Sequence, residues 1–202
     1  MRYCVYADQG DMECTIMNEE NPLFKIIAEL TCNAEKVDQS QLEVCCDLLC
    51  KASRIFVAGA GRSGFAARAF TNRLMHLGFT VFFVGDTTTP SIQGDDLLII
   101  GSGSGATASL VNMAEKAKKI GSSIVTMTIF PNARIGALAH AVITVPGSTP
   151  KSETESGATS FQPMGNLFEQ LSWLIYDALA IMLMQRLGIT AEEMFARHAN
   201  LE

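Results

Sequence analysis

From residue 54 onward, short apolar runs alternate with longer segments in which apolar residues recur every three to four positions. The apolar runs are 55–58, 80–84, 97–100, 123–129 and 141–145. They are mostly apolar throughout, which is typical of parallel strands buried on both faces. The pattern predicts an α/β fold: a three-layer α/β/α sandwich around a mostly parallel, about five-stranded, flavodoxin-like sheet.

Helical periodicity predicts the layers that cover this sheet. The expected helices are 22–37, 40–52, one that ends near 77, 107–120, 166–187 and a short one after 190. Asn21 is a suitable N-cap and Pro22 suits the first helical position, so the first helix has a clear start. These helices place helical arms at both ends of a single domain, 21–202. Residues 1–20 have no clear period and are expected to form a loose extension.

Composition and charge indicate a globular domain and argue against one class of binding partner. The chain has 202 residues, of which 48% are hydrophobic and 18% charged, and this balance is typical of a globular domain. The net charge of −6 argues against a nucleic-acid partner, which would require a basic face. A small anionic ligand stays possible, because a few local donors are enough to hold it.

Metal binding and membrane insertion are not expected. The histidines are scattered and no C-x-x-C occurs, so the cysteines are interpreted as free thiols in a reducing cytosol. The acidic, polar N-terminus does not resemble a signal peptide. The longest apolar run, 171–184, contains Asp177 and is too short to span a bilayer. We therefore expect a soluble, cytoplasmic protein.

A first glycine turn follows the first predicted strand. Its three glycines have the G-x-G-x-x-G spacing of a dinucleotide fingerprint: Gly59, Gly61 and Gly64. An acid, Asp86, follows the next strand, so a nicotinamide enzyme is one interpretation. However, Arg62 and Ser63 lie inside the turn. A guanidinium and a hydroxyl there favour an anionic or hydroxyl-rich ligand over a dinucleotide.

A second turn with the same strand–turn–helix context lies at 101–107. It carries three hydroxyls, on Ser102, Ser104 and Thr107, with Gly103 and Gly105 between them. Backbone N–H groups and the positive end of the dipole at a helix N-terminus bind anions. Helix capping alone would account for one hydroxyl but not for three. Both turns are expected at the carboxyl ends of parallel strands, where they would face one crevice and bind a sugar phosphate.

Five strings of the chain together resemble the 6-phospho-3-hexuloisomerase branch of the sugar isomerase (SIS) domain family. They are AGAGRSG, RLMHLGF, IIGSGSGAT, QPMGNLFEQ and RHANLE, and the resemblance covers about 22–202. It implies a SIS-type fold and reversible conversion of D-arabino-hex-3-ulose 6-phosphate to D-fructose 6-phosphate. It also implies the formaldehyde-fixing ribulose monophosphate pathway, no metal or organic cofactor, and a homo-oligomer, expected to be a tetramer.

That reaction moves a carbonyl through a cis-enediolate, so it requires a base and proton transfer between two oxygens. Glu169, in the first turn of the predicted 166–187 helix, is the expected base. A favourable interaction of its charge with the helix dipole is the alternative. The resemblance also implies a role for His76 in moving oxygen protons or opening the sugar ring. His198 is near the C-terminus and is expected to reach a site only in a neighbouring subunit.

Two departures from the family bear on substrate choice. The family usually carries Glu where this chain has Ala106 and Asp86. The loop 146–165 is long for a compact domain, and loops of this length often serve function. Its charged residues, Lys151, Glu153 and Glu155, would form either a lid or a solvated surface.

Other functions stay open at this point. One is a different sugar-phosphate isomerase of the same family, and another is a sensor that binds a sugar phosphate without turnover. A nicotinamide dehydrogenase is the least favoured, and a DNA-binding segment is not evident because the first helices have few basic residues. The 166–187 helix is apolar nearly all round, which predicts burial on most faces and self-association through it.

Overall fold

The computed structural model describes residues 3–6, 12–15, 21–149 and 160–201. Within these residues the main sheet has five strands in the order β4-β3-β5-β6-β7, and every pair in it is parallel. The strands are β3 (Ile55–Gly59), β4 (Val81–Phe83), β5 (Leu97–Gly101), β6 (Ser123–Thr128) and β7 (Ala141–Thr144). The predicted fold class and all five predicted strands are confirmed, with ends that differ by one or two residues.

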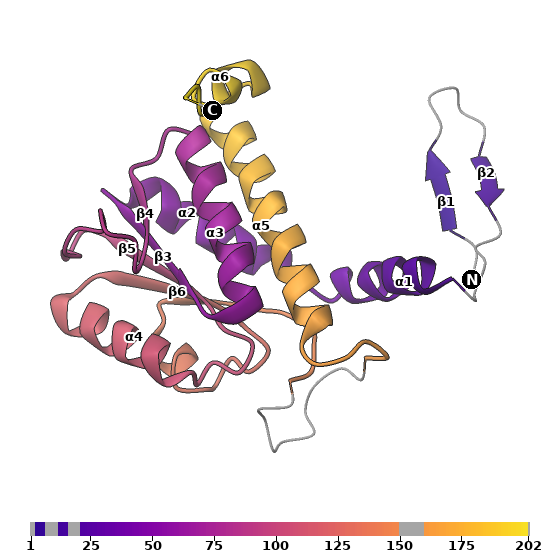
Figure 1. Ribbon diagram of the computed structural model, residues 1–202, viewed down its shortest axis with the longest axis horizontal. Helices are drawn as coiled ribbons and strands as arrows, with labels where there is room; N and C mark the ends of the chain where they lie inside the picture. Colours follow the sequence, from indigo (N-terminus) through magenta and orange to yellow (C-terminus); the bar gives the residue numbers. More distant parts are fainter. Residues whose placement is uncertain (1–2, 7–11, 16–20, 150–159, 202) are drawn as a thin grey trace.

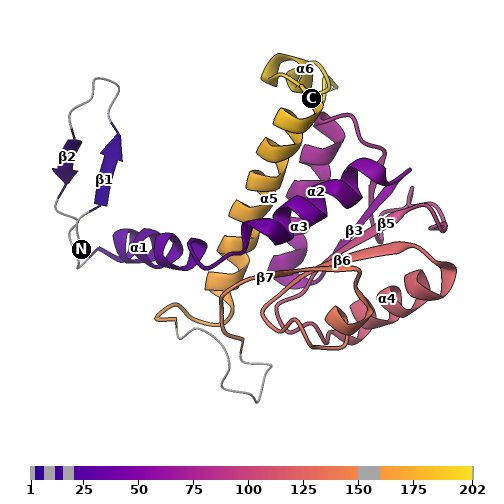
Figure 2. The same cartoon turned by 180° about the vertical axis from the view of Figure 1, so that it is seen from behind.

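The helices also match the prediction. They are α1 (Pro22–Ala34), α2 (Gln39–Lys51), α3 (Gly61–His76), α4 (Ala108–Ile120), α5 (Asn166–Leu187) and α6 (Ala191–Phe195), with a 3-10 turn at Gly136–Leu138 that the sequence pattern did not predict. Helices α2, α3 and α5 cover one face of the sheet, whereas α4 covers the other (Figures 1 and 2). The right-handed crossovers of parallel strands produce such a two-sided arrangement.

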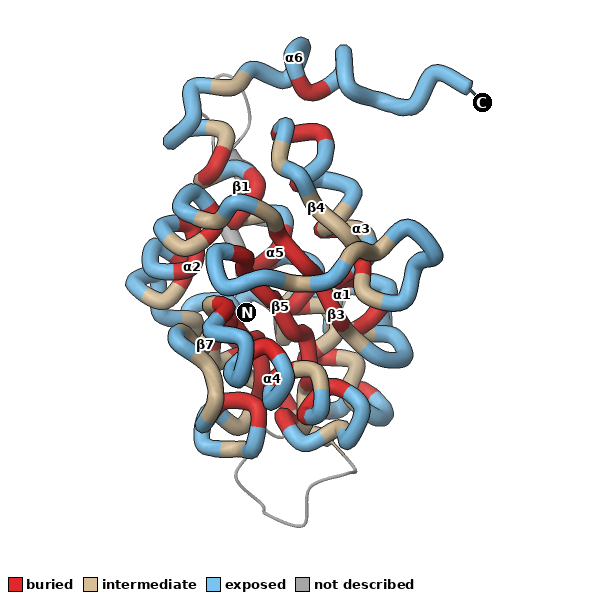
Figure 3. Tube along the Cα trace, turned by 90° about the vertical axis from the view of Figure 1, so that its left-hand side faces the viewer, coloured by how far each residue is buried: buried red, intermediate tan, exposed pale blue. Residues whose placement is uncertain are grey.

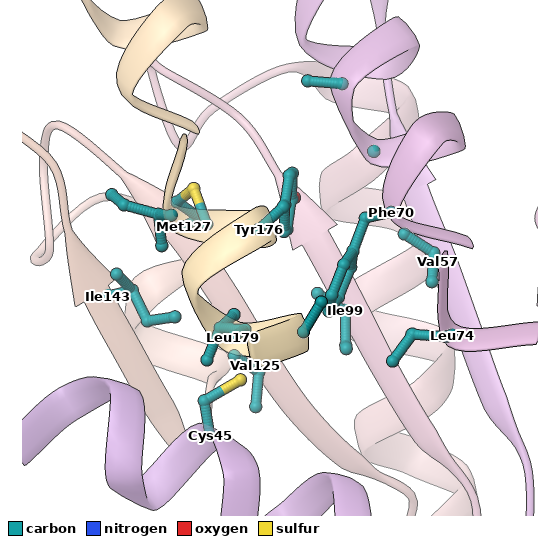
Figure 4. Close-up of a cluster of buried hydrophobic side chains, with 14 of the residues drawn as sticks. Cys45, Val57, Phe70, Leu74, Ile99, Val125, Met127, Ile143, Tyr176 and Leu179 are labelled. Carbon is teal, nitrogen blue, oxygen red and sulfur yellow. The ribbon is translucent and has the colours of Figure 1, made fainter. Parts of the chain in front are cut away.

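Alternating side chains of each strand build two cores. In β3, Ile55 and Val57 belong to the cluster under α2, α3 and α5, whereas Phe56 and Ala58 belong to the cluster under α4. Figure 4 shows the larger cluster, to which the strands contribute Val57 and Ile99, α3 contributes Phe70, and α5 contributes Tyr176. Because both faces are covered, the strands are apolar at nearly every position.

The long apolar helix corrects one expectation. The run 171–184 is too short to span a bilayer, but α5 extends beyond it to 22 residues and is long and apolar enough to do so by length and composition. Half of the most apolar 18-residue stretch of α5 is nevertheless buried inside the domain, where Leu171, Leu179 and Leu183 join the core. The structure therefore accounts for the apolar character of α5 by packing.

The two ends of the chain extend from this body. Residues 3–6 and 12–15, expected to be loose, form strands β1 (Tyr3–Tyr6) and β2 (Met12–Thr15) that pair antiparallel. Helix α1 projects sideways from the sandwich (Figure 1), and Asn21 caps it by accepting a hydrogen bond from the Leu23 N–H at 2.9 Å. Figure 3 shows that the segment beyond α5 is mostly exposed. The predicted helical arms are thus present at both ends.

Candidate functional site

Three helices begin at the same place without a capping side chain. In the described part of the chain, the N-caps of α3, α4 and α5 are Ala60, Thr107 and Gly165, and none makes a side-chain cap hydrogen bond. By contrast, side chains cap α1, α2 and α6. Residues from all three uncapped starts line one cavity of about 210 Å³. Free N–H groups and positive dipole ends therefore meet there, as an anion requires.

The first glycine turn fixes how closely α3 approaches β3. A Cβ on Gly59 would lie 2.9 Å from the Cα of Gly64, and a Cβ on Gly64 would lie 2.8 Å from the Gly59 carbonyl oxygen. Both positions therefore require glycine for packing between strand and helix. This explains the G-x-G-x-x-G spacing without a dinucleotide and leaves Arg62 and Ser63 at the cavity.

The second glycine turn is held by backbone bonds so that its hydroxyls face the cavity. The Ser102 N–H donates to the Met127 carbonyl at 2.9 Å, and the Ile135 N–H donates to the Gly105 carbonyl at 2.9 Å. Gly105 has φ +60°, and a Cβ there would lie 2.8 Å from the Ala133 Cβ. No larger residue fits at this position. Gly105 thus shapes the turn from behind and does not line the cavity.

The hydroxyls of this turn are not used for helix capping. The Ser104 hydroxyl only accepts a long bond, 3.3 Å, from the Ala106 N–H. The Ser102 Oγ is buried and has no hydrogen-bond partner among the described residues. Buried hydroxyls nearly always have a partner, so an unpaired one that lines a cavity indicates a ligand. The capping alternative therefore does not explain these residues.

The cavity brings most of the predicted site residues together. Its lining includes Gly61, Arg62, Ser63, Ser102, Gly103, Ser104, Thr107 and Glu169. Arg62 Nε donates to Glu169 Oε2 at 2.5 Å, which joins the first turn of α3 to the first turn of α5. The Arg62 side chain is 65% exposed and that of Glu169 is 18% exposed. A hydroxyl-rich turn at a helix start and a partly buried carboxylate thus share one cavity.

Several lining residues were not predicted individually. Ser148, Thr149, Met164 and Gly165 come from the two described ends of the long loop, and Phe168 comes from α5. Met164 adopts a left-handed conformation, with φ +58°, which is uncommon for a non-glycine residue. The length of the loop was the signal in the sequence, and its ends do line the cavity. Lys151, Glu153 and Glu155 lie outside the described residues.

Within one chain, the two candidate histidines lie far from this cavity. His76 is the last residue of α3 and lies 14 positions after Arg62 on the same helix, about 20 Å away at 1.5 Å per residue. Its ring stacks on that of His198, with 5.3 Å between ring centroids. Burial lowers the pKa of His76, and the nearby charges of Arg73 and His198 lower it further. The sequence analysis grouped His76 with Glu169, but one chain does not bring them together.

The two positions that depart from the family also lie outside the cavity lining. Asp86 forms an ion pair with Arg68, at 2.9 Å, beside the edge strand β4. It lines a separate cavity of about 280 Å³. Ala106 is exposed next to the second turn. Among the residues that the structure describes, no group of three or more His, Cys, Asp or Glu side chains is arranged to hold a metal ion.

Comparison with known proteins places these features in a family. Residues 48–171 match the model of the SIS domain. The chain is 43% identical to a Bacillus subtilis protein named 3-hexulose-6-phosphate isomerase, over 88% of this chain and 96% of that protein. It is 42% identical to a protein of the same name from Mycobacterium gastri, over 97% of this chain and 98% of the relative.

A solved structure agrees with these sequence relatives. A Methanococcus jannaschii protein, whose crystal structure infers a function of 3-hexulose-6-phosphate isomerase, superposes with a TM-score of 0.77 at 34% identity. The match covers 89% of this chain and 98% of the other. The chain belongs to the SIS domain family.

Proposed function

We propose that this SIS domain is a 3-hexulose-6-phosphate isomerase, which interconverts D-arabino-hex-3-ulose 6-phosphate and D-fructose 6-phosphate. The observation that carries the proposal is the buried Ser102 hydroxyl, unpaired among the described residues, in a cavity that also contains Glu169. Such a cavity offers a phosphate seat and a base within one small volume. The names of the relatives supply the sugar.

The phosphate would bind at the second turn. Ser102, Ser104 and Thr107 supply hydroxyl donors there, and the N-terminus of α4 supplies backbone N–H groups. Arg62 and Ser63, across the cavity, would contact the phosphate or the sugar hydroxyls. Binding of the phosphate, which does not react, holds the sugar in register for the proton transfer.

Glu169 would act as the base. It takes a proton from carbon 2 of the 3-ketose and delivers a proton, which exchanges with solvent, to carbon 3 of the enediolate. Proton transfer by a positioned carboxylate requires neither a metal nor an organic cofactor. The enediolate oxygen would accept hydrogen bonds from donors at the uncapped helix starts, as in other anionic intermediates.

The oxygen protons are assigned to a histidine of a second subunit, because His76 and His198 lie about 20 Å from Arg62 along their own chain. A surface groove of about 500 Å³ between α1, α3 and α5 is mostly apolar and includes Arg62 and Glu169. Its Phe65, Trp173 and Leu174 are exposed. We expect a second copy of the chain to cover it in a homotetramer, and sedimentation that gives a monomer would contradict this.

The proposed substrate indicates the metabolic role of the enzyme. The 3-ketose phosphate arises when formaldehyde adds to a ribulose phosphate, so the enzyme would serve formaldehyde fixation by the ribulose monophosphate pathway. We place it in the cytoplasm, with no nucleic-acid or membrane partner.

A coupled assay tests the function. Ribulose 5-phosphate, formaldehyde and a hexulose-phosphate synthase are supplied, and formation of fructose 6-phosphate is followed. We expect product with the wild type and a loss of roughly 100-fold or more with Glu169→Gln. Glu115→Gln is the matched control, because Glu115 also pairs with an arginine, Arg134, but on the surface of α4. A folded wild type that makes no product contradicts the proposal.

Two alternatives predict different outcomes. Another sugar-phosphate isomerase of this family would keep the phosphate seat and the base but would turn over a different sugar. A sensor would bind fructose 6-phosphate without turnover in either variant. The place of Glu169 in the cavity lining favours an enzyme, since a sensor needs no carboxylate beside the bound sugar.

A further inference from the structure

Arg62 contacts the proposed base and also lines the cavity of the second turn. Its Nε donates to Glu169 Oε2 at 2.5 Å, and the same residue lines the cavity with Ser102 and Thr107 of the second turn. One guanidinium therefore lies within reach of both a carboxylate and the seat of an anion. Its five N–H donors lie in one plane in a fixed geometry, and the contact with Glu169 is made by the Nε–H.

The contact with Glu169 opposes the action of a base. A carboxylate oxygen that accepts a charge-assisted hydrogen bond from a guanidinium has one lone pair engaged and is held toward the donor. To take a proton from carbon, that oxygen must face the sugar. In the Arg62–Glu169 pair, Oε2 faces the guanidinium instead.

Within the single chain, Arg62 is held only loosely in this arrangement. Its side chain is 65% exposed, so little packing holds it, whereas the Glu169 side chain is 18% exposed and is fixed on α5. A sugar phosphate carries nearly two negative charges at neutral pH and three terminal oxygens, and guanidinium groups bind such oxygens in pairs. A bound phosphate therefore competes well with a single carboxylate for the guanidinium.

We propose that Arg62 transfers from Glu169 to the phosphate when the sugar phosphate binds, so that the substrate itself releases the base. Binding of the phosphate group and readiness of the base are then coupled through one side chain. A sugar without phosphate leaves Glu169 paired and reacts slowly, and this selects for phosphorylated substrates. The inference rests on the proposed function, because it takes Glu169 as the base.

A double-mutant cycle with inorganic phosphate tests the transfer without any turnover. The dissociation constant of phosphate is measured by calorimetry for the wild type, Glu169→Gln, Arg62→Ala and the double variant. Glu169→Gln releases Arg62, so we expect it to tighten phosphate binding by about tenfold, the equivalent of about 1.4 kcal/mol. With Arg62→Ala as background, only the repulsion by the carboxylate is removed, and tightening should be about twofold.

The two backgrounds distinguish a transfer of Arg62 from the simple loss of a negative charge. Equal tightening in both would overturn the transfer, as would unchanged phosphate affinity in Arg62→Ala. Glu115→Gln, which removes a paired carboxylate elsewhere, should leave phosphate affinity unchanged. If the cycle shows coupling while the coupled assay yields no fructose 6-phosphate, the transfer stands and the proposed reaction fails. If turnover is observed without coupling, the reaction stands and the transfer fails.

A second measurement tests release of the base directly. D-fructose, which lacks phosphate, is incubated in D₂O with the wild type, with and without phosphite dianion. We expect phosphite to raise deuterium incorporation at least roughly tenfold, because it draws Arg62 from Glu169. The Arg62→Ala variant should incorporate label at a rate that phosphite does not change. Activation of both proteins by the same factor would contradict the role of Arg62.

Discussion

We call the end of the sheet at which the strands begin the amino edge, and the end at which they finish the carboxyl edge. Polar groups at these two edges differ in their hydrogen bonding. At the amino ends of the strands, Asp96 is buried, and its carboxylate accepts bonds from Arg54 at 3.0 and 2.7 Å and from the Gln93 N–H at 2.6 Å. Beside it, the Ser122 hydroxyl donates to the Gln93 carbonyl at 2.7 Å. These polar groups are satisfied within the chain.

At the carboxyl ends, polar groups lack such partners. Three helices begin there without a side-chain cap, and the Ser102 hydroxyl is buried and unpaired among the described residues. The Tyr176 hydroxyl, likewise buried without a partner in that part of the chain, lies 2.9 Å from where a Cβ on Gly101 would be. The contrast indicates that the amino edge contributes stability, whereas the carboxyl edge keeps donors available for a ligand at some cost in stability.

The largest effect expected at the amino edge comes from Asp96→Ala. The change leaves the Arg54 charge and the Gln93 N–H without their partner, next to a buried site. We expect the free energy of unfolding to fall by about 3 kcal/mol. Phosphate affinity should not change, because this edge lies opposite the cavity. Urea unfolding and calorimetry check both values, and a weaker affinity in the folded variant would break the comparison.

Two serine variants, one at each edge, test the same difference with smaller expected changes in the free energy of unfolding. Ser122→Ala removes a satisfied bond and should lower the free energy of unfolding by about 1 kcal/mol without affecting phosphate binding.

Ser102→Ala should have the opposite effects. It removes a buried hydroxyl that is unpaired among the described residues, so stability should stay equal or rise by up to about 1 kcal/mol. Phosphate binding should weaken by about tenfold, since a hydrogen bond to a charged group contributes about 1.5–3 kcal/mol. Thermal unfolding with and without phosphate measures both. If Ser102→Ala is as destabilising as Ser122→Ala, the hydroxyl has a structural partner and the two edges are alike.

The smallest effect concerns pH and His76, at the far end of α3. Burial, then the charges of Arg73 and His198, lower the pKa of this imidazole in the folded state. Well above its ordinary value of 6.5 the group is neutral in both states and contributes nothing. As the pH falls through that value, the unfolded chain binds the proton first, so folded stability is lost until the pH passes the lower folded value.

His76→Phe keeps a ring against His198 and removes this titration. Urea midpoints at about pH 8 and about pH 5.5, on either side of the ordinary histidine pKa, should therefore differ less for the variant than for the wild type. Equal acid-induced losses in the two proteins would show that His76 does not cause the effect.

The sequence predicted the fold well because its signals are local. Apolar strands and amphipathic helices carry their own periodicity, and the cap at Asn21 is encoded within a few residues. The β1–β2 pairing was missed because each strand is only four residues long and lacks a clear alternation.

The site was predicted only in part, because some of its contacts join residues that are far apart in the sequence. Both glycine turns follow strands, so their place at one sheet edge follows from topology, and Glu169 joined them through the family resemblance. Sequence could not show that His76 lies about 20 Å from Arg62, because the length of α3, not a motif, separates them. Nor could it show the Arg62–Glu169 contact, which joins residues 107 positions apart.

The most direct test of the central claim is where deuterium enters fructose 6-phosphate in D₂O. A base that works through a 2,3-enediolate exchanges the hydrogen on carbon 3. We expect the wild type to label carbon 3, and Glu169→Gln to do so at least roughly 100-fold more slowly. Label at carbon 1 would mean a 1,2-enediolate and thus an isomerase that converts fructose 6-phosphate to an aldose phosphate. No label from a folded, phosphate-binding wild type would mean that the carboxyl edge only binds. Either result would contradict the account.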